Sequence, residues 1–181
     1  MLESPDGTYW FPQDFSPDNQ RLLIRNYVGN ADSRIHLLEL DTKEVRMVAG
    51  DPENPGSNDA ISFDREGTGF FLVTDVNGEF RQLAWQSLEE GSKPQIITGE
   101  IPWHVEGAVV SDDLTRMAFT VNNNGFSQLY LMDMDSREYR AVDSIPTGLV
   151  GRLEFSPDGT RLGMTLNNSR TPSDSFVLGL G

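Results

Sequence analysis

The chain has 181 residues and a formal net charge of −14, from 28 acidic and 14 basic residues. This charge argues against a nucleic-acid partner, because phosphate binding requires a basic surface. With no cysteine, the chain can form neither a disulfide nor a thiolate metal site. No apolar run is long enough to span a membrane, so no membrane partner is expected. Residues 1–6 lack the basic and apolar parts of a signal peptide, and if Met1 is the true start we expect a cytoplasmic protein.

The first strand-rich unit covers about residues 8–50. Four segments in it are rich in aromatic and branched apolar residues, at 8–15, 21–28, 35–40 and 45–48. Residues 29–33, Gly-Asn-Ala-Asp-Ser, have the composition of a loop between the second and third strands. Four strands in about 40 residues is the size of one blade of a β-propeller.

Three further units of similar content follow, at about residues 58–99, 104–143 and 148–181. The dipeptide Asn77-Gly78 and the run from Asn122 to Gly125 predict hairpin turns. Pro94 is compatible with an outer edge strand, where its missing N–H costs no ladder hydrogen bond. The last unit has three predicted strands, at 151–155, 161–166 and 175–180, and lacks the fourth. Since no stretch shows sustained helical periodicity, we predict an all-β chain.

A turn motif recurs once in each of these four strand-rich segments. It reads Ser-Pro-Asp-Gly at 156–159 and Ser-Pro-Asp-Asn at 16–19, with weaker copies at 64–67 and 111–114. Proline presets φ for the turn, and glycine or asparagine tolerates positive φ. The preceding apolar residues, Phe15, Phe63, Val110 and Phe155, are 48, 47 and 45 residues apart. Such a period predicts a partial β-propeller of about four blades of four antiparallel strands, the last blade incomplete. The four apolar residues should fill equivalent places between blades.

An incomplete number of blades has a physical consequence. Each blade buries its faces only against its neighbours, so both end blades would expose an apolar face. We therefore expect the chain to be part of a longer ring, with self-association possible through the open end blades. A self-sufficient small propeller of four blades is the alternative.

The sequence contains no evident catalytic site of its own. A nucleophile elbow requires Gly-x-Ser-x-Gly, and no such pentapeptide occurs. His36 lies in a predicted strand and His104 in a loop beside Trp103, and neither has the partners of a zinc site. We predict structural or surface roles for both histidines, and packing roles for Trp10, Trp85 and Trp103.

Two acidic clusters resemble sites and are better explained as solvated turns. Glu89-Glu90 is followed by Gly91-Ser92, as expected of a hairpin loop. Asp133 and Asp135 lack the glycine and the closing glutamate of a calcium loop. The prediction is therefore no catalytic residue, no cofactor-binding residue, no metal ligand and no cofactor.

Three segments resemble the propeller of prolyl-oligopeptidase-family serine peptidases: residues 7–28, 101–107 and 153–174, with Trp103 to Gly107 and Arg170 to Asp174 the more specific stretches. The Ser-Pro-Asp-Gly motif alone is shared with TolB-like propellers. In that peptidase family the propeller caps an α/β-hydrolase domain carrying a Ser-Asp-His triad and restricts access to short peptides. No catalytic residue of the family has a counterpart in this sequence.

The resemblance implies a non-catalytic gating part of a serine peptidase that hydrolyses short peptides. Its implied partners are the missing α/β-hydrolase domain, the remaining blades and a peptide substrate. Two alternatives stay open: a TolB-like protein-interaction propeller with no peptidase domain, and a truncated product with no independent function.

Overall fold

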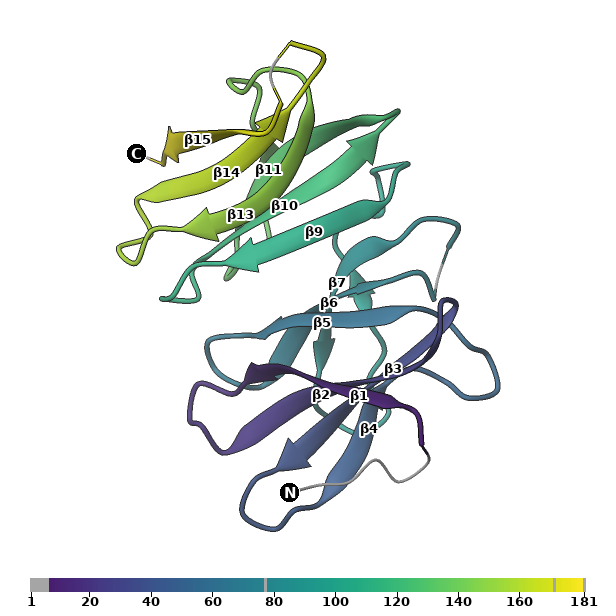
Figure 1. Cartoon of the computed structure of the whole chain (residues 1–181). Helices are drawn as coiled ribbons and strands as arrows, with labels where there is room; N and C mark the ends of the chain where they lie inside the picture. The colour runs from purple at the N-terminus through teal and green to yellow at the C-terminus, as the bar shows by residue number, and fades with distance from the viewer. Residues whose placement is uncertain (1–6, 77, 171, 181) are drawn as a thin grey trace. The chain divides into compact units, whose positions relative to one another are not determined.

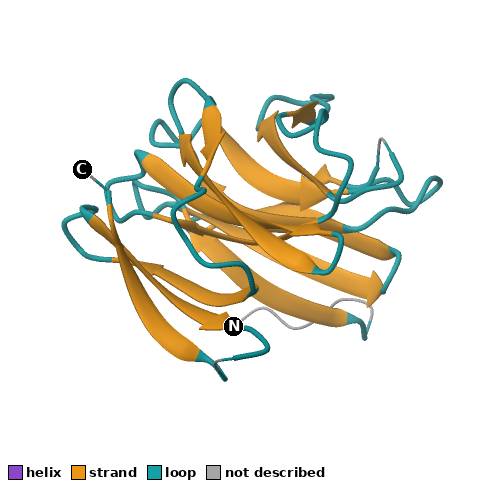
Figure 2. Ribbon diagram, turned by 90° about the horizontal axis from the view of Figure 1, so that it is seen from above, coloured by secondary structure: helices purple, strands orange, loops and turns teal. Residues whose placement is uncertain are grey.

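The computed structural model describes residues 7–76, 78–170 and 172–180. Over these residues the chain consists of β-strands joined by turns and loops, with no helix (Figures 1 and 2). Accordingly, the described part contains no helical segment suited to crossing a membrane. The chain divides into two compact units, Met1–Glu100 and Ile101–Gly181.

The first unit contains two four-stranded antiparallel sheets. In each sheet the strands lie side by side in chain order, which is the meander of a propeller blade. The first sheet comprises β1 (Tyr9–Phe15), β2 (Arg21–Gly29), β3 (Asp32–Glu39) and β4 (Val45–Ala49). The second comprises β5 (Asn58–Phe63), β6 (Gly69–Thr74), β7 (Gln82–Ser87) and β8 (Gln95–Ile96).

The second unit contains one sheet of four strands and one of three. The four-stranded sheet comprises β9 (Val105–Val110), β10 (Arg116–Asn123), β11 (Phe126–Asp133) and β12 (Tyr139–Ala141). The three-stranded sheet comprises β13 (Leu149–Phe155), β14 (Arg161–Asn167) and β15 (Asp174–Gly179). The all-β class, the antiparallel sheets and the incomplete last sheet are confirmed, and the chain is a partial β-propeller.

Two local predictions from the turn residues can be compared with the structure. The β10–β11 hairpin is confirmed, with positive φ of 53° at Asn124 and 89° at Gly125. Residues 32 and 33, expected in a loop, begin β3 instead, because Ser33 pairs with Tyr27 in the sheet. The other expected hairpin includes Asn77, which lies outside the described residues.

The recurring turn has the same geometry in all four sheets. Its fourth residue, which is Asn19, Gly67, Leu114 or Gly159, has φ between 56° and 66° and donates its N–H to the carbonyl of the first. In the last copy the Ser156 hydroxyl donates to Asp158 Oδ1 at 2.6 Å and accepts from the Arg161 N–H at 3.0 Å. The serine thus ties the start of the turn to the next strand.

The carboxyl of Asp158 should make stability depend on pH. The Ser156 hydroxyl, followed by the N–H and hydroxyl of Thr160, holds the pKa of Asp158 at about 2, below its ordinary 3.8. Because the folded-state pKa is depressed, this stabilising contribution is present above the unfolded-state pKa and is lost as the pH falls from about 4 to about 2. We expect Asp158→Asn to be less stable than wild type at pH 7 and equally stable at the acid end. Urea unfolding across this range measures the difference, and a variant that keeps the full acid dependence would contradict the assignment.

Of the four residues at the fourth turn position, Leu114 is the least suited to a positive φ. A left-handed backbone costs a residue with a Cβ roughly 1–2 kcal/mol, while asparagine tolerates it better. We expect Leu114→Asn to raise the free energy of unfolding by about 0.5–1 kcal/mol. The reciprocal change, Asn19→Leu, should lower it by about the same amount. Urea denaturation midpoints test both, and a loss of stability in Leu114→Asn would show that its half-buried side chain outweighs the backbone strain.

Each unit has an apolar core between its two sheets. In the first, β6 is buried along its whole length, and Phe63 and Phe70 pack with Leu23, Ile35 and Leu37 from the first sheet. In the second, the core consists of Ala118, Leu129, Val142, Phe155, Leu162, Met164 and Leu180. Facing sheets are therefore held together mainly by burial of side chains from their middle strands.

The expectation for the four repeated apolar residues holds only in part. Phe63 and Phe155 are buried between sheets, and Val110 is half-buried. The prediction is wrong for Phe15, whose side chain is 55% exposed. The physical reason is its position: Phe15 pairs with Leu22 on the face of the first sheet that points away from the core formed by Leu23.

Consecutive sheets are also joined by a polar clasp that recurs in both units. Ser33 of β3 donates its N–H to Gly56 O at 3.0 Å, and its hydroxyl accepts the Asn58 N–H at 2.8 Å. In the second unit Ser127 of β11 donates to Gly148 O at 2.9 Å and accepts the Val150 N–H at 3.0 Å. The serine satisfies buried backbone groups where the chain passes from one sheet to the next.

Candidate functional site

The site begins at the first strand of each sheet in the first unit. β1 and β5 are both edge strands, and both contain a bulge. The bulge in β1 places Gln13 against β5, and with the Gln13 amide turned so that its nitrogen faces β5, this nitrogen donates to Asp59 Oδ1 and to Ala60 O, each at 2.9 Å. Asp14 accepts the Phe63 N–H at 2.9 Å, and burial raises the pKa of this carboxyl against the opposing effect of that hydrogen bond. Bulges of this kind redirect side chains.

Asp59 on β5 lies between two arginines. Arg25 Nη1 of β2 donates to Asp59 Oδ1 at 3.2 Å, and Arg81 Nη2 lies 3.7 Å from Oδ2. All three side chains are partly exposed, with 23% of Arg25 and 33% of Arg81 accessible. Two cationic groups therefore contact the same carboxylate.

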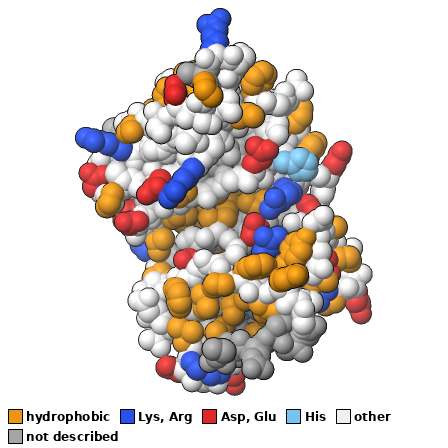
Figure 3. Space-filling view, in the orientation of Figure 1, with side chains coloured by type: hydrophobic (Ala, Val, Ile, Leu, Met, Phe, Trp, Pro, Cys, Tyr) orange, Lys and Arg blue, Asp and Glu red, His pale blue; other side chains and the backbone are white. Residues whose placement is uncertain are grey.

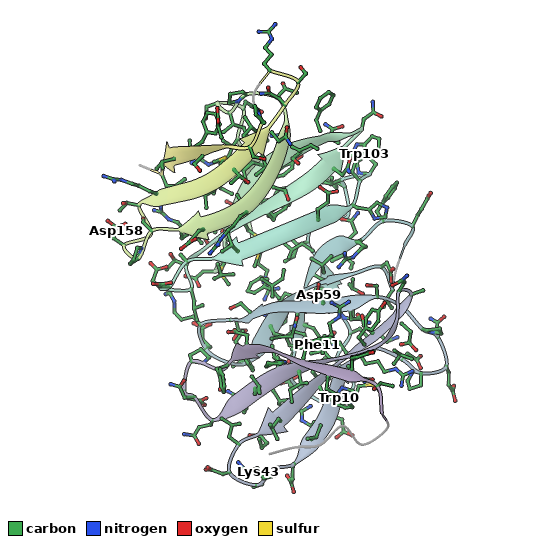
Figure 4. The ribbon with its side chains drawn as sticks, in the orientation of Figure 1. Trp10, Phe11, Lys43, Asp59, Trp103 and Asp158 are labelled. Atoms are coloured by element: carbon green, nitrogen blue, oxygen red, sulfur yellow. The ribbon has the colours of Figure 1, made fainter. Side chains whose placement is uncertain are left out.

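Three aromatic rings lie on the same face of the first sheet as Arg25. The register pairs Tyr9 with Tyr27 and Phe11 with Arg25, and directly paired residues point to the same side. The rings of Tyr9 and Phe11 are stacked with centroids 6.3 Å apart, and the Arg25 guanidinium lies 5.6 Å from the centre of the Tyr27 ring. Figure 4 labels Phe11 on β1 and Asp59 on β5. We call this group of Tyr9, Phe11, Arg25, Tyr27, Asp59 and Arg81 the arginine–aromatic cluster.

The chemistry available in this cluster is binding. Guanidinium groups bind carboxylates through paired hydrogen bonds, and exposed aromatic rings bind apolar side chains. The cluster has no serine, cysteine or histidine that could act as a nucleophile or its general base. It can therefore hold a ligand in place, but it contains no group for covalent catalysis.

Both histidines are placed as surface or packing residues. His36 on β3 packs on Trp10 of β1, with ring centroids 4.6 Å apart. His104 is exposed in the segment before β9, next to the half-buried Trp103. Trp85, the third tryptophan, is half-buried and donates its Nε1–H to Asp64 Oδ2 at 3.1 Å.

The two acidic clusters lie in exposed turns. Glu89 and Glu90 follow β7 in a loop, and Asp133 caps a turn by accepting the N–H and hydroxyl of Ser136 at 2.8 and 2.9 Å. Asp135 is exposed in the same turn. Across residues 7–76, 78–170 and 172–180, no group of three or more potential ligand side chains is arranged to hold a metal ion.

The surface of the second unit has an open hollow of about 770 Å³. It is formed by the β10–β11 hairpin and the segments before β13 and after β14, and its walls include Phe126, Pro146, Leu149 and Arg170. Phe126 and Leu149 are exposed. The hollow combines apolar walls with one cation, and no nucleophile–base pair is formed there.

The arginine–aromatic cluster was not identified from the sequence. Arg25 lies on β2, Asp59 on β5 and Arg81 immediately before β7, and no spacing rule connects them. A partial signal was available, because Tyr9 and Phe11 alternate along one predicted strand and Arg25 and Tyr27 along the next.

Comparison with known proteins agrees with this architecture. None of the profiles of known protein families matches the sequence. Among solved structures, the chain is similar to prolyl oligopeptidase B from Galerina marginata, with a TM-score of 0.78 and 13% identity over 99% of this chain and 26% of that one. For a structure from a study of two prolyl endopeptidases, the TM-score is 0.74 and the sequence identity 14%, over 99% of this chain and 26% of that one. For TolB from Acinetobacter baumannii, the TM-score is 0.69 and the sequence identity 18%, over 96% of this chain and 41% of that one.

The chain thus spans between about a quarter and two fifths of the length of these proteins. At such identities the similarity shows the fold. This chain is a segment of a β-propeller of the kind found in TolB and in prolyl oligopeptidases.

Proposed function

We propose that this chain is the non-catalytic propeller part of a prolyl-oligopeptidase-like serine peptidase, where it controls the access of short peptides to a separate catalytic domain. The observation that carries the proposal is the match of 99% of the chain to prolyl oligopeptidase B, at a higher TM-score than the match to TolB. The resemblance of residues 101–107 and 170–174 to propeller segments of that family supports it independently.

The distribution of exposed and half-buried apolar residues supports a larger parent protein. On the first sheet, Trp10, Phe15, Leu22 and Ile24 lie on one face together with Met47. Figure 3 shows hydrophobic side chains gathered over this part of the chain. Patches of this kind are typical of interfaces. A further propeller blade would cover this face as the second sheet covers the other, and self-association of the isolated chain would use the same surface.

The outer face of the last sheet has a different character. Glu154 and Gly163 pair across β13 and β14, Thr165 pairs with Ser175, and the exposed Val177, which pairs with Gly163, is an apolar side chain among these polar ones. Arg152 and Glu154 form an exposed ion pair at 3.2 Å. Such a surface tolerates water, so the need for a covering sheet is greater at the first sheet than at the last.

The decisive experiment compares the isolated chain with the natural protein that contains it. An antibody raised against the chain would capture that protein from source cells, and a fluorophosphonate probe would report a reactive serine. We expect the captured protein to be larger than 181 residues, to react with the probe and to hydrolyse short peptides. The isolated chain should neither react with the probe nor hydrolyse peptides. Serine-dependent hydrolysis by the isolated chain, or no labelling of the captured protein, would overturn the proposal.

A second candidate is a protein-interaction propeller without a peptidase domain. It is favoured by the 18% identity to TolB over 96% of the chain, which exceeds the identity to the prolyl oligopeptidases. Under this alternative the captured protein carries no reactive serine and is recovered together with a protein partner.

A further inference from the structure

We propose that the arginine–aromatic cluster is a binding site for a peptide segment that presents a carboxylate next to an aromatic or branched apolar side chain. This inference deepens the proposed function, because it names a substrate class for the propeller and not merely a barrier role. It concerns Arg25, Arg81 and Asp59 together with the rings of Tyr9, Phe11 and Tyr27.

The charge of the cluster selects an anion. Arg25 gives Asp59 one terminal N–H, at 3.2 Å, and a guanidinium carries several such donors in a planar fork. Stacking on Tyr27 and pairing with Asp59 fix the orientation of this fork, so little side-chain entropy is lost when a ligand binds. Arg81 adds a second positive charge on the other side of Asp59. Two guanidinium groups this close together attract a carboxylate, although the chain as a whole has a net charge of −14.

The aromatic rings select the neighbouring apolar group. Tyr9 is 70% exposed and Phe11 47%, although both lie on the face of the first sheet that elsewhere forms the core with the second sheet. Their rings are nearly parallel, with an angle of 16° between them, and form an apolar surface on the same face of the sheet as Arg25. Burying this surface against a ligand side chain gains free energy in proportion to the area removed from water.

The two parts of the cluster are one side chain apart. Phe11 is directly opposite Arg25 in the β1–β2 ladder, a separation of about 5 Å between paired residues. Adjacent groups of an extended peptide are separated by a similar distance of roughly 3.3–7 Å. A ligand can therefore place its carboxylate on the guanidinium and its apolar side chain on the rings at the same time.

The carboxylate can come from a glutamate or aspartate side chain or from the C-terminus of the peptide. Both present the same planar acceptor to arginine. Capped and uncapped peptides distinguish the two sources.

The test is a titration of the isotope-labelled full chain with short peptides, followed by NMR. The probes are acetyl-Gly-Phe-Glu-Gly-amide, its neutral isostere with glutamine, and acetyl-Gly-Gly-Phe as the free acid and as the amide. We expect at least one carboxylate peptide to bind about tenfold more tightly than its neutral counterpart, with shifts at residues of β1, β2 and β5. Equal affinity of both acid–amide pairs, or shifts elsewhere only, would overturn the proposal.

Variants separate the two parts of the site. Phe11→Ser should lower the affinity for every peptide that binds. Arg25→Gln should remove the preference for the carboxylate peptide over its neutral counterpart and keep weak binding of the apolar side chain. Phe126→Ser, which changes an exposed aromatic residue in the second unit, is the matched control and should leave affinity unchanged. If Arg25→Gln fails to fold, Arg81→Gln and the wild-type comparison of acid and amide peptides still decide the matter.

The outcome is independent of the fluorophosphonate experiment. A captured protein with a reactive serine and a chain without carboxylate preference would refute only the present inference. A chain that prefers carboxylate peptides, with no reactive serine in the captured protein, would refute the peptidase and retain the peptide site.

Discussion

Replacing Phe63 by alanine is expected to lower the free energy of unfolding by about 3–5 kcal/mol, the range for emptying a buried aromatic site. The ring is fully buried between the two sheets of the first unit, beside Phe70 and Leu23. The Arg21 guanidinium lies over the ring, 5.7 Å from its centre. Phe155→Ala, in the second unit, should cost about 3 kcal/mol or more, because its side chain is only 8% exposed.

The matched control is Phe15→Ala at the equivalent position of the first repeat. Its ring is largely exposed, so we expect a change within about 0.5 kcal/mol. Urea denaturation followed by circular dichroism gives all three values. A loss at Phe15 comparable to that at Phe63 would mean that the isolated chain covers this face in solution, as it would on self-association. A small loss at Phe63 would contradict the core assignment.

The second large effect is expected at the polar clasp of the first unit. Asn58 is almost completely buried and donates its Nδ2 hydrogens to Ser33 O at 2.8 Å and to Gly56 O at 3.2 Å. Its Oδ1 accepts from the Thr74 hydroxyl at 2.9 Å. Asn58→Ala leaves these buried partners unsatisfied, and each such group costs about 1–3 kcal/mol. We expect a total loss of roughly 3 kcal/mol.

The clasp prediction has its own control. Asn123→Ala removes an exposed asparagine at the end of β10 and should be nearly neutral. Hydrogen exchange adds a local readout, because the Ser33 and Asn58 amides should lose protection in Asn58→Ala. Unchanged exchange at these two amides, together with a small loss of stability, would show that water replaces the amide without cost.

Much of the fold could be predicted from the sequence because its determinants are local. Residues such as Asn19 and Gly159 at positive φ, and serine and aspartate around them, close the turns through bonds within a few residues. The Asn124-Gly125 hairpin follows from the same steric rule. Alternation of side chains along strands then gives four sheets of the expected order. The sequence also excluded a nucleophile elbow and a thiolate metal site, because these depend on residues that are absent.

The rest depended on which faces meet in space. Phe15 and Phe63 occupy the same place in their repeats, yet one is exposed and the other buried, because only a neighbouring sheet makes the difference. The clasp of Ser33 and Asn58 and the pairing of Arg25 with Asp59 join residues that are 25 and 34 positions apart. Side-chain hydrogen bonds of this kind have no periodicity, so pattern analysis cannot predict them. The sequence by itself thus determined the strands, the turns and the repeat, whereas the buried contacts and the arginine–aromatic cluster were decided by the packing of one sheet on the next.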